Sequence, residues 1–544
     1  MAEPPQDEMP PERRPGRTPA ERAGATPLDP ERFRANVGMP MVQRQREIPG
    51  QVPVEDEPVE PIVRRRPTRR RRTVSARPIW WAAGVLGVIG LALIAVGWFT
   101  EGDVESASAP PPELVAATPV LSARRVPELV SRPVAVRNLR AAIDPVLART
   151  PPASCLQVRE GAVPLVSSNE TAQVVPASNL KIVTGAAALA LLDPQSRLTT
   201  RFVTDGDPTD GRVVRGNLYM IGGGDPLLST DSYLNQLPNG RQPATQMEAV
   251  ADQIVATGIR EITGSVVGDD SRYDDVRIID SWPERYLTQG QSGPLSALTV
   301  NDAWSATTGP GSDPPVHAAA VLTQLLEERG VTVAGEPTAG VAPEDAAPLT
   351  EVTSLTVAEL VDEGLRFSDN TTMEMLVKEI GVQTSDTGST EAGLAAIRTW
   401  IEESGLPAEG TEIVDGSGLS EQNRLTCRYV SALLEQQGTD GVVANGLARP
   451  GEPGTLDDRL LEADLQGRVR AKTGTLRPVT ALSGWLQTVP ERNLGFSYII
   501  NTTDRQVNEA DEALQADLLE SMLSYPDRPE LTELSPGAPV APGT

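Results

Sequence analysis

Ser178 and Lys181 lie three residues apart at the start of an apolar segment, which is predicted to be a helix from about Ala177 to Leu192. Positions i and i+3 share one face of a helix, so the hydroxyl and the amine would lie close together. A serine hydroxyl is a weak nucleophile and needs a base to take its proton. The chain has one histidine, His317, so a Ser-His-Asp triad could use only that residue, and Lys181 is the alternative base. A lysine acts as a base only when it is neutral, which requires burial or a second positive charge nearby.

A second lysine lies in Lys472-Thr473-Gly474-Thr475, which its apolar surroundings predict to be an edge strand. The chain has only three lysines among its 48 Lys and Arg residues, and two of them fall in these two motifs. Arginine cannot replace lysine where an amine must lose its proton, because the guanidinium stays charged. A strand lysine with hydroxyl neighbours suits a substrate carboxylate and could lower the pKa of Lys181, while Gly474 would let a substrate approach the backbone. Taken singly, each motif is more simply a solvated helix or strand end.

Ser368-Asp369-Asn370 precedes a predicted helix that starts near Thr371, where capping of the helix is the ordinary role of such residues. The order S-x-x-K, S-D-N and K-T-G along one chain is far more specific than any of the three alone. With it, the sequence resembles the low-molecular-mass penicillin-binding proteins of the D-alanyl-D-alanine carboxypeptidase and DD-endopeptidase family, of the penicillin-binding protein four type. The resemblance covers about residues 135–525. It extends to Gly216–Tyr219, Gly222–Pro226, Gly268–Ser271, Asn370–Lys378, Asp415–Ser420 and Asn423–Leu425.

The resemblance implies an α+β, transpeptidase/β-lactamase-like fold, in which a five-stranded antiparallel sheet is flanked by helices. It also implies a smaller α/β domain inserted between Lys181 and Ser368, and a change to short strand-like runs over residues 200–315 matches that insertion. In order along the chain, we predict a disordered Arg/Pro-rich cytoplasmic tail (1–78), a transmembrane signal anchor (79–99), an extracytoplasmic linker (100–133), the peptidase domain (134–199 and 316–525), the inserted domain (200–315) and a disordered Pro-rich tail (526–544).

The resemblance also assigns catalytic roles. By it, Ser178 attacks the peptide carbonyl between two terminal D-alanines and forms an acyl-enzyme, which water then hydrolyses. Lys181 is the general base for acylation, and Ser368 relays a proton towards the leaving amine. The backbone N–H groups of Ser178 and Thr475 form the oxyanion hole. Asn370 holds the side-chain amide of the substrate, and the Lys472 motif holds its terminal carboxylate. The predicted substrate-binding residues are Asn370, Lys472, Thr473, Gly474 and Thr475.

The N-terminal hundred residues predict a membrane anchor. An arginine-rich block between residues 64 and 77 is followed by the 21 uncharged residues from Ile79 to Phe99, long enough for a helix to cross the roughly 30 Å of hydrocarbon. The positive-inside rule places the arginines in the cytoplasm and the remainder of the chain outside it. A net charge of −26 argues against a general nucleic-acid binder, whose affinity depends on neutralising phosphates.

Three further features carry weaker predictions. Cys155 and Cys427 are the only cysteines, and the sequence leaves open whether they form a disulfide or stay as buried thiols. Asp415–Gly418 is predicted to be a structural loop near the site. Lys378 has no chemical task in this set, and we expect it to pair with an acid on its own helix or to pack its stem.

Together these features predict a membrane-anchored serine-type D-Ala-D-Ala carboxypeptidase, possibly a DD-endopeptidase, that acts on peptidoglycan stem peptides and is acylated by penicillin. Such chemistry needs no metal and no organic cofactor. Two alternatives remain at this point: a β-lactamase or esterase on the same scaffold, and a catalytically inactive cell-wall-binding protein.

Overall fold

The computed structural model describes residues 127–527, except residues 207–210, 238–242, 306–308, 311–312 and 491. The predicted cytoplasmic tail and transmembrane span therefore lie outside the described residues, as do residues 528–544 of the predicted C-terminal tail. No helix among the described residues is both long and apolar enough to cross a membrane.

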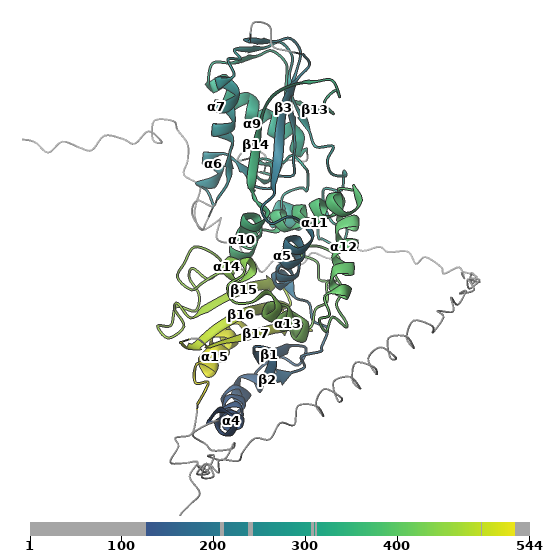
Figure 1. Ribbon diagram of the computed structural model, residues 1–544. Coiled ribbons are helices and arrows are strands. Elements are labelled where there is room, and N and C mark those ends of the chain that lie inside the picture. The colour runs from purple at the N-terminus through teal and green to yellow at the C-terminus, as the bar shows by residue number, and fades with distance from the viewer. Residues whose placement is uncertain are drawn as a thin grey trace, which may run out of the picture. The chain divides into compact units, whose positions relative to one another are not determined.

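A five-stranded sheet forms the centre of the part that carries the three motifs, and its strands follow the order β15-β16-β17-β1-β2 (Figure 1). Every neighbouring pair is antiparallel. The strands are β1 (Cys155–Glu160), β2 (Val163–Ser168), β15 (Val469–Leu476), β16 (Val479–Val489) and β17 (Arg492–Asn501). Strands β1 and β2 form a hairpin. It turns at Gly161, where a φ of 56° suits glycine.

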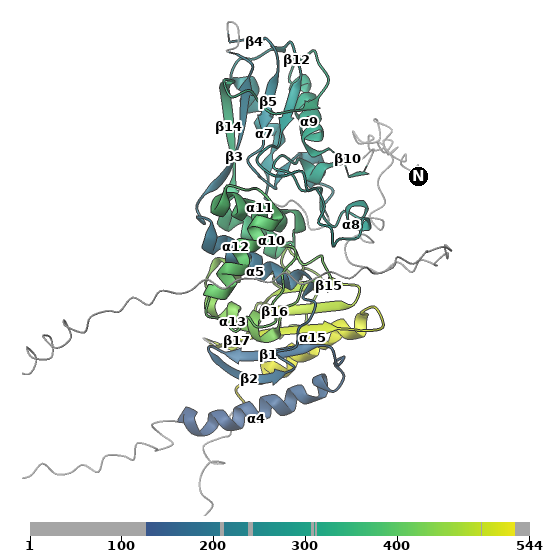
Figure 2. The ribbon, with the colours of Figure 1, turned by 90° about the vertical axis from the view of Figure 1, so that its right-hand side faces the viewer.

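Helices cover both faces of this sheet, because alternate strand residues are apolar on each face. On one face, α4 (Pro127–Leu147) and α15 (Glu509–Leu523) pack on the strands, as Figure 2 shows. On the other face, α13 (Cys427–Gln437) contacts β17 and β1. It belongs to a helical layer with α5 (Leu180–Leu191), α10 (Val357–Arg366), α11 (Asn370–Ser385), α12 (Thr390–Glu403) and α14 (Val442–Gly446). This arrangement is the predicted α+β fold.

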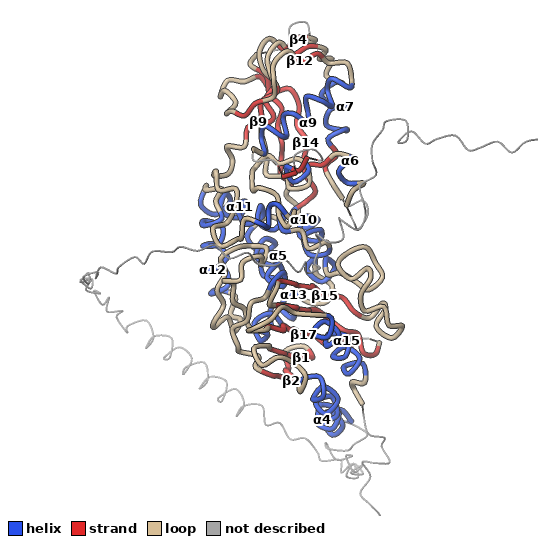
Figure 3. Tube along the Cα trace, turned by 180° about the vertical axis from the view of Figure 1, so that it is seen from behind, coloured by secondary structure: helices blue, strands red, loops and turns tan. Residues whose placement is uncertain are grey.

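The segment between α5 and α10 forms a second sheet with the order β13-β9-β5-β3-β14, and α7 and α9 lie beside its strands (Figure 3). Its longer elements are β3 (Arg197–Thr204), β5 (Leu218–Ile221), α7 (Met247–Ala256), β9 (Val266–Asp269), α9 (Pro314–Glu328), β13 (Thr338–Ala339) and β14 (Ala347–Thr356). The shorter ones are β4 (Val213–Val214), β6 (Leu228–Ser229), α6 (Asp231–Leu234), β7 (Thr245–Gln246), β8 (Glu261–Ile262), α8 (Arg285–Thr288), η2 (Asn301–Ala303), β10 (Trp304–Ser305), β11 (Gly309–Pro310) and β12 (Thr332–Val333).

Two predicted boundaries are wrong. The insertion does not end at residue 315, because α9 packs in its core and β14 pairs with β3, so it runs from β3 to residue 356. The linker does not extend to residue 133, because α4 already begins at Pro127. The buried Leu139 and Ile143 fix that helix against the sheet.

The cysteines form a disulfide, Cys155–Cys427, that joins β1 to α13 across 272 residues of sequence. Both are buried in an apolar cluster that also contains Ala177, the residue before Ser178. The disulfide thus lies next to the turn that carries the predicted nucleophile.

Candidate active site

Ser178 lies in a 3-10 turn, η1 (Ala177–Asn179), that runs directly into α5. The Nζ of Lys181, one turn later, lies 2.9 Å from the Oγ of Ser178. Lys181 is fully buried, and its Nζ also donates to the Oδ1 of Asn370 and to the carbonyl of Ser417, each at 2.6 Å. Of these three acceptors only the serine hydroxyl also carries a proton to give. An uncharged Lys181 is therefore aimed at the one proton that must leave for Ser178 to attack.

Burial lowers the pKa of Lys181 to about 8, although neighbouring carboxylates oppose that fall. The carboxylates are those of Asp415, Glu374, Asp369 and Glu363. The low pKa was expected from burial or from the positive charge of Lys472, and in the structure burial is its first cause. Burial, and then the positive charge of Lys181, lower the pKa of Lys472 well below its ordinary value.

Lys472 lies on β15 and contacts the second serine of the predicted site. Its Nζ donates to the Oγ of Ser368 at 2.8 Å and to the carbonyl of Thr473 at 3.0 Å. Ser368 has a φ of 62°, a conformation that costs a non-glycine residue energy and that is found at functional sites. Capping of α11 is done by Asp369, whose side chain accepts the N–H of Thr372 at 2.8 Å. The S-D-N motif thus combines a cap with side chains directed at two lysines.

Gly474 allows β15 to pass directly beside η1. A Cβ at this position would lie 3.0 Å from the backbone nitrogen of Ser178 and from the side-chain nitrogen of Asn179. The sequence assigned this glycine to substrate approach, but the close contact is with the chain itself. Thr475, the next residue, is exposed at the edge of the sheet. The structure therefore brings all eight predicted site residues, from the three motifs, into one region.

The sequence reasoning missed two contributors on the far side of Lys181. One is the carbonyl of Ser417: the loop Asp415–Gly418 was predicted to lie near the site, but no role was predicted for its carbonyl. The other is Glu374, which accepts the N–H of Gly416 at 2.9 Å and that of Ser417 at 2.7 Å. Burial and the charge of Asp415 raise the pKa of Glu374 to about 8. Glu374 lies four residues after Asn370 on α11, a spacing that places both on one face and could have pointed to it.

Lys378 was expected to pair with an acid on its own helix or to pack its stem, and the expected pair within the helix is not formed. It is fully buried and forms an ion pair with Asp274 of the inserted domain. A long-range pair of this kind cannot be inferred from helical spacing. No three of the His, Cys, Asp and Glu side chains in the described ranges are grouped so as to hold a metal ion.

The D-Ala-D-Ala carboxypeptidase 3 (S13) family matches the sequence over residues 139–310 and 310–522. The chain belongs to this family. Those ranges contain all three motifs together with the inserted domain, so the resemblance drawn from the motifs is confirmed.

Two curated relatives match over most of their own length. The chain is similar to a D-alanyl-D-alanine carboxypeptidase of Actinomadura sp. (strain R39), at 28% identity over 62% of this chain and 75% of that protein. It is similar to carboxypeptidase DacB of Mycolicibacterium smegmatis, at 28% identity over 83% of this chain and 98% of the relative. Among solved structures, penicillin binding protein 4 of Haemophilus influenzae superposes with a TM-score of 0.57 at 18% identity, over 71% of this chain and 98% of that one. That superposition supports the transpeptidase-like fold.

Proposed function

We propose that the protein is a serine-type D-Ala-D-Ala carboxypeptidase that acts on peptidoglycan stem peptides through an acyl-enzyme on Ser178 and that penicillin acylates it. The observation that carries this proposal is the 2.9 Å contact between the Nζ of Lys181 and the Oγ of Ser178 in a buried site. Family membership supports the same reaction class, and a structure of the Haemophilus influenzae protein is described as a complex with a β-lactam.

Acylation begins when uncharged Lys181 accepts the proton of Ser178, whose Oγ then attacks the carbonyl carbon of the scissile amide. The tetrahedral oxyanion is stabilised by the backbone N–H groups of Ser178 and Thr475. The C–N bond breaks as the leaving amine of the terminal D-alanine takes a proton from Ser368. The contact of 2.8 Å with Lys472 lets Ser368 be resupplied with a proton. A water molecule then attacks the ester carbonyl, the Oγ of Ser178 leaves with the proton held by Lys181, and the proton that the water loses returns to the pair of Ser368 and Lys472. The shortened peptide is released and the site is restored.

The remaining residues of the three motifs bind the substrate. The positive end of Lys472 and the hydroxyls of Thr473 and Thr475 suit the terminal carboxylate, since charge-assisted hydrogen bonds to carboxylates are among the strongest available. Asn370 keeps a side-chain N–H for an amide carbonyl of the substrate, because it donates one hydrogen to the carbonyl of Gln291 and its amide carries two.

The test uses the full-length protein in detergent with a fluorescent penicillin and with a peptide that ends in D-Ala-D-Ala. The parent chain should give a covalent fluorescent band and release D-alanine. Ser178→Ala should give neither. Ser521→Ala, a matched control on α15, should behave as the parent, because its hydroxyl only donates to the carbonyl of Asp517 on its own helix.

The two alternatives give different results in the same experiment. Rapid turnover of penicillin without release of D-alanine would favour a β-lactamase or esterase. Absence of any band from the folded parent would favour an inactive wall-binding protein. A label that maps to a serine other than Ser178 would overturn the assignment of the nucleophile.

We further propose that Ile79–Phe99 anchors the protein in the membrane with the peptidase domain outside the cytoplasm. The uncharged span behind an arginine block supports this topology, as does the disulfide, since disulfides persist mainly in oxidising compartments. Protease added to intact spheroplasts should digest the peptidase domain and spare the first 78 residues. The reverse pattern would contradict the topology.

A further inference from the structure

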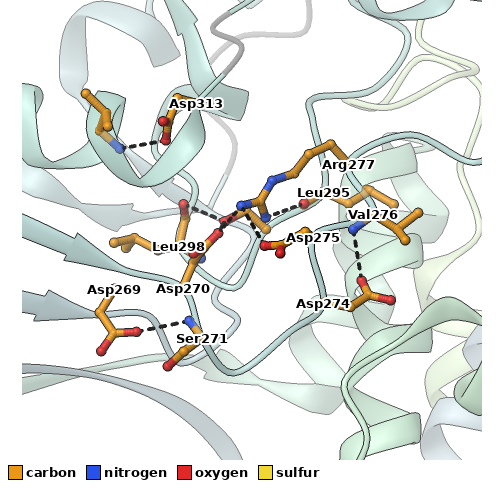
Figure 4. A network of polar contacts seen from close by, with 12 residues as sticks. Asp269, Asp270, Ser271, Asp274, Asp275, Val276, Arg277, Leu295, Leu298 and Asp313 are labelled. Atoms are coloured by element: carbon orange, nitrogen blue, oxygen red, sulfur yellow. Dashed lines mark hydrogen bonds and ion pairs between the residues drawn. The ribbon is translucent and has the colours of Figure 1, made fainter. Parts of the chain in front are cut away.

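A loop of the inserted domain, residues 277–295, reaches the predicted active site, and its two ends are held together. The N–H of Leu295 donates to the carbonyl of Arg277 at 2.9 Å, and the Arg277 side chain donates to the carbonyl of Leu295 at 3.1 Å. Arg277 also forms an ion pair of 2.6 Å with Asp270, as Figure 4 shows. The loop therefore leaves and returns at one fixed point, which limits how far its middle can move.

The returning end of this loop is attached to the start of α11. The side chain of Asn370 donates to the carbonyl of Gln291 at 2.5 Å, and the N–H of Gly293 donates to the hydroxyl of Thr371 at 3.0 Å. Because the amide nitrogen of Asn370 is bound to the loop, its oxygen is turned towards Lys181. The loop thus orients one of the three partners of the proposed base.

The middle of the loop contacts the segment that carries a second partner, Ser417, and the contact is made by the buried Trp282. The indole N–H of Trp282 donates to a carboxylate oxygen of Asp415 at 2.9 Å. The other hydrogen bonds that the described residues make to this carboxylate come from its own segment: the N–H groups of Gly418 and Ser420, and the side chain of Asn423, at 2.7–2.9 Å. Four N–H donors on two oxygens favour the ionised carboxylate, which only accepts hydrogen bonds. Trp282 is the donor that ties this segment to the inserted domain.

The segment that begins at Asp415 is in turn part of the base site. The carbonyl of Ser417 accepts from Lys181 at 2.6 Å. Gly418 lies so close to the turn before the nucleophile that a Cβ there would be 2.0 Å from the carbonyl of Ala177. A shift of this segment would therefore move both the acceptor of Lys181 and the backbone that carries Ser178.

We propose that Trp282 of the inserted domain is a positioning residue for Lys181, acting through its hydrogen bond to Asp415 and the carbonyl of Ser417. This inference rests on the proposed role of Lys181 as the base. It gives the insertion a part in the chemistry of the peptidase domain and predicts that a change in the insertion alters the ionisation of the base.

The direction of that change follows from the charges that face Lys181. The groups are the carboxylates of Asp415, Glu374, Asp369 and Glu363 and the amine of Lys472. Asp415 is the first of the carboxylates that raise the pKa of Lys181. Burial raises the pKa of Asp415 itself, and the hydrogen bond from Trp282 opposes that rise. Loss of the Trp282 N–H favours neutral Asp415, removes negative charge beside Lys181, and so lowers the pKa of Lys181.

The experiment compares Trp282→Phe with Trp485→Phe in the full-length protein. Both variants replace a buried indole by a phenyl ring. Trp485 is the matched control because its N–H has no hydrogen-bond partner among the described residues. The readout is the rate constant for acylation by fluorescent penicillin as a function of pH, with thermal unfolding of each variant measured alongside.

For Trp282→Phe we expect the rate constant on the high-pH plateau to be about tenfold lower, which is the lower end of the effect of a hydrogen bond to a charged group. We also expect the acid limb, the part of the profile in which the rate constant rises with pH, to move to lower pH. Trp485→Phe should leave both unchanged. Asp415→Asn should move the limb in the same direction, and adding Trp282→Phe to it should give no further shift. This second arm keeps the inference testable if Trp282→Phe fails to fold.

A folded Trp282→Phe with the parent plateau and limb would overturn the inference and leave the proposed function intact. An equal fall in rate for both tryptophan variants, without a shift of the limb, would also overturn it, since that is an effect of packing alone. A parent chain that is never acylated, or that is labelled away from Ser178, would overturn the proposed function and the inference with it.

Discussion

Acylation of this protein by penicillin should speed up as the pH rises through about 8. The base must be uncharged to accept the proton of Ser178, and burial lowers the pKa of Lys181 to about 8. An ordinary lysine has a pKa near 10.4 and would be almost wholly charged at neutral pH. The structure therefore predicts an acid limb more than two pH units below that of an exposed amine.

The size of the effect follows from the neutral fraction of Lys181. With a pKa of about 8, roughly 9% of the amine is uncharged at pH 7, half at pH 8 and about 91% at pH 9. The second-order rate constant for acylation should thus rise about tenfold between pH 7 and pH 9 and change little above that. The assay is the appearance of the covalent band at several concentrations of a penicillin that has no ionisable group in this range.

A control variant separates this limb from that of the histidine. Burial lowers the pKa of His317, so His317→Gln should leave the acylation profile unchanged. A rate constant that stays constant from pH 6 to pH 9 in folded protein would refute the reasoning. So would a limb that appears only near pH 10, because Lys181 would then be as easily protonated as an exposed lysine.

Three further outcomes are expected. Lys181→Met should lower the acylation rate by about 10²–10⁴-fold, the usual contribution of a general base. The protein should stay folded because methionine fills the same buried space. Labelling at the parent rate would exclude Lys181 as the base. Gly474→Ala should destabilise the fold by about 1–3 kcal/mol and slow acylation, because the new methyl group would press on the backbone of Ser178. Thermal unfolding measures the loss of stability. Unchanged stability would contradict the close packing of Gly474 against Ser178. Replacing Cys155 and Cys427 together by alanine should cost about 2–5 kcal/mol in urea unfolding, near the upper end because the loop spans 272 residues; a cost below about 1 kcal/mol would show that the bridge adds little.

Much of the site could be predicted from the sequence because it depends on residue type and local spacing. The scarcity of lysine singled out positions 181 and 472, and helical spacing alone placed the first beside Ser178. Which lysine contacts which serine could not be predicted, since the contact of Lys472 with Ser368 joins residues 104 positions apart. The loop that contains Ser417 was predicted to lie near the site, but the contact of its carbonyl with Lys181 was not, because a backbone carbonyl is common to every residue.

In the fold, too, elements set by neighbouring residues were predicted, and contacts between distant residues were not. The helix from about Ala177 to Leu192 was predicted from its own apolar pattern, and α5 confirms it. The end of the insertion was misplaced because β14 pairs with β3 about 150 residues earlier, and nothing within residues 316–356 reveals that partner. The helical pattern of α9 likewise gives no indication of which of two cores its apolar face enters.

The disulfide has a consequence for how the chain matures. Cys155 is synthesised long before Cys427, and the intervening residues include the entire insertion and the first two motifs. Because the sequence has no third cysteine, Cys155 can form an intramolecular disulfide only with Cys427. The oxidised protein therefore has a single disulfide connectivity and needs no disulfide exchange. Closure must wait until α13 has been made, and β15, which carries Lys472, is made later still, so the disulfide cannot guide the folding of the segments that precede α13 while they are being synthesised.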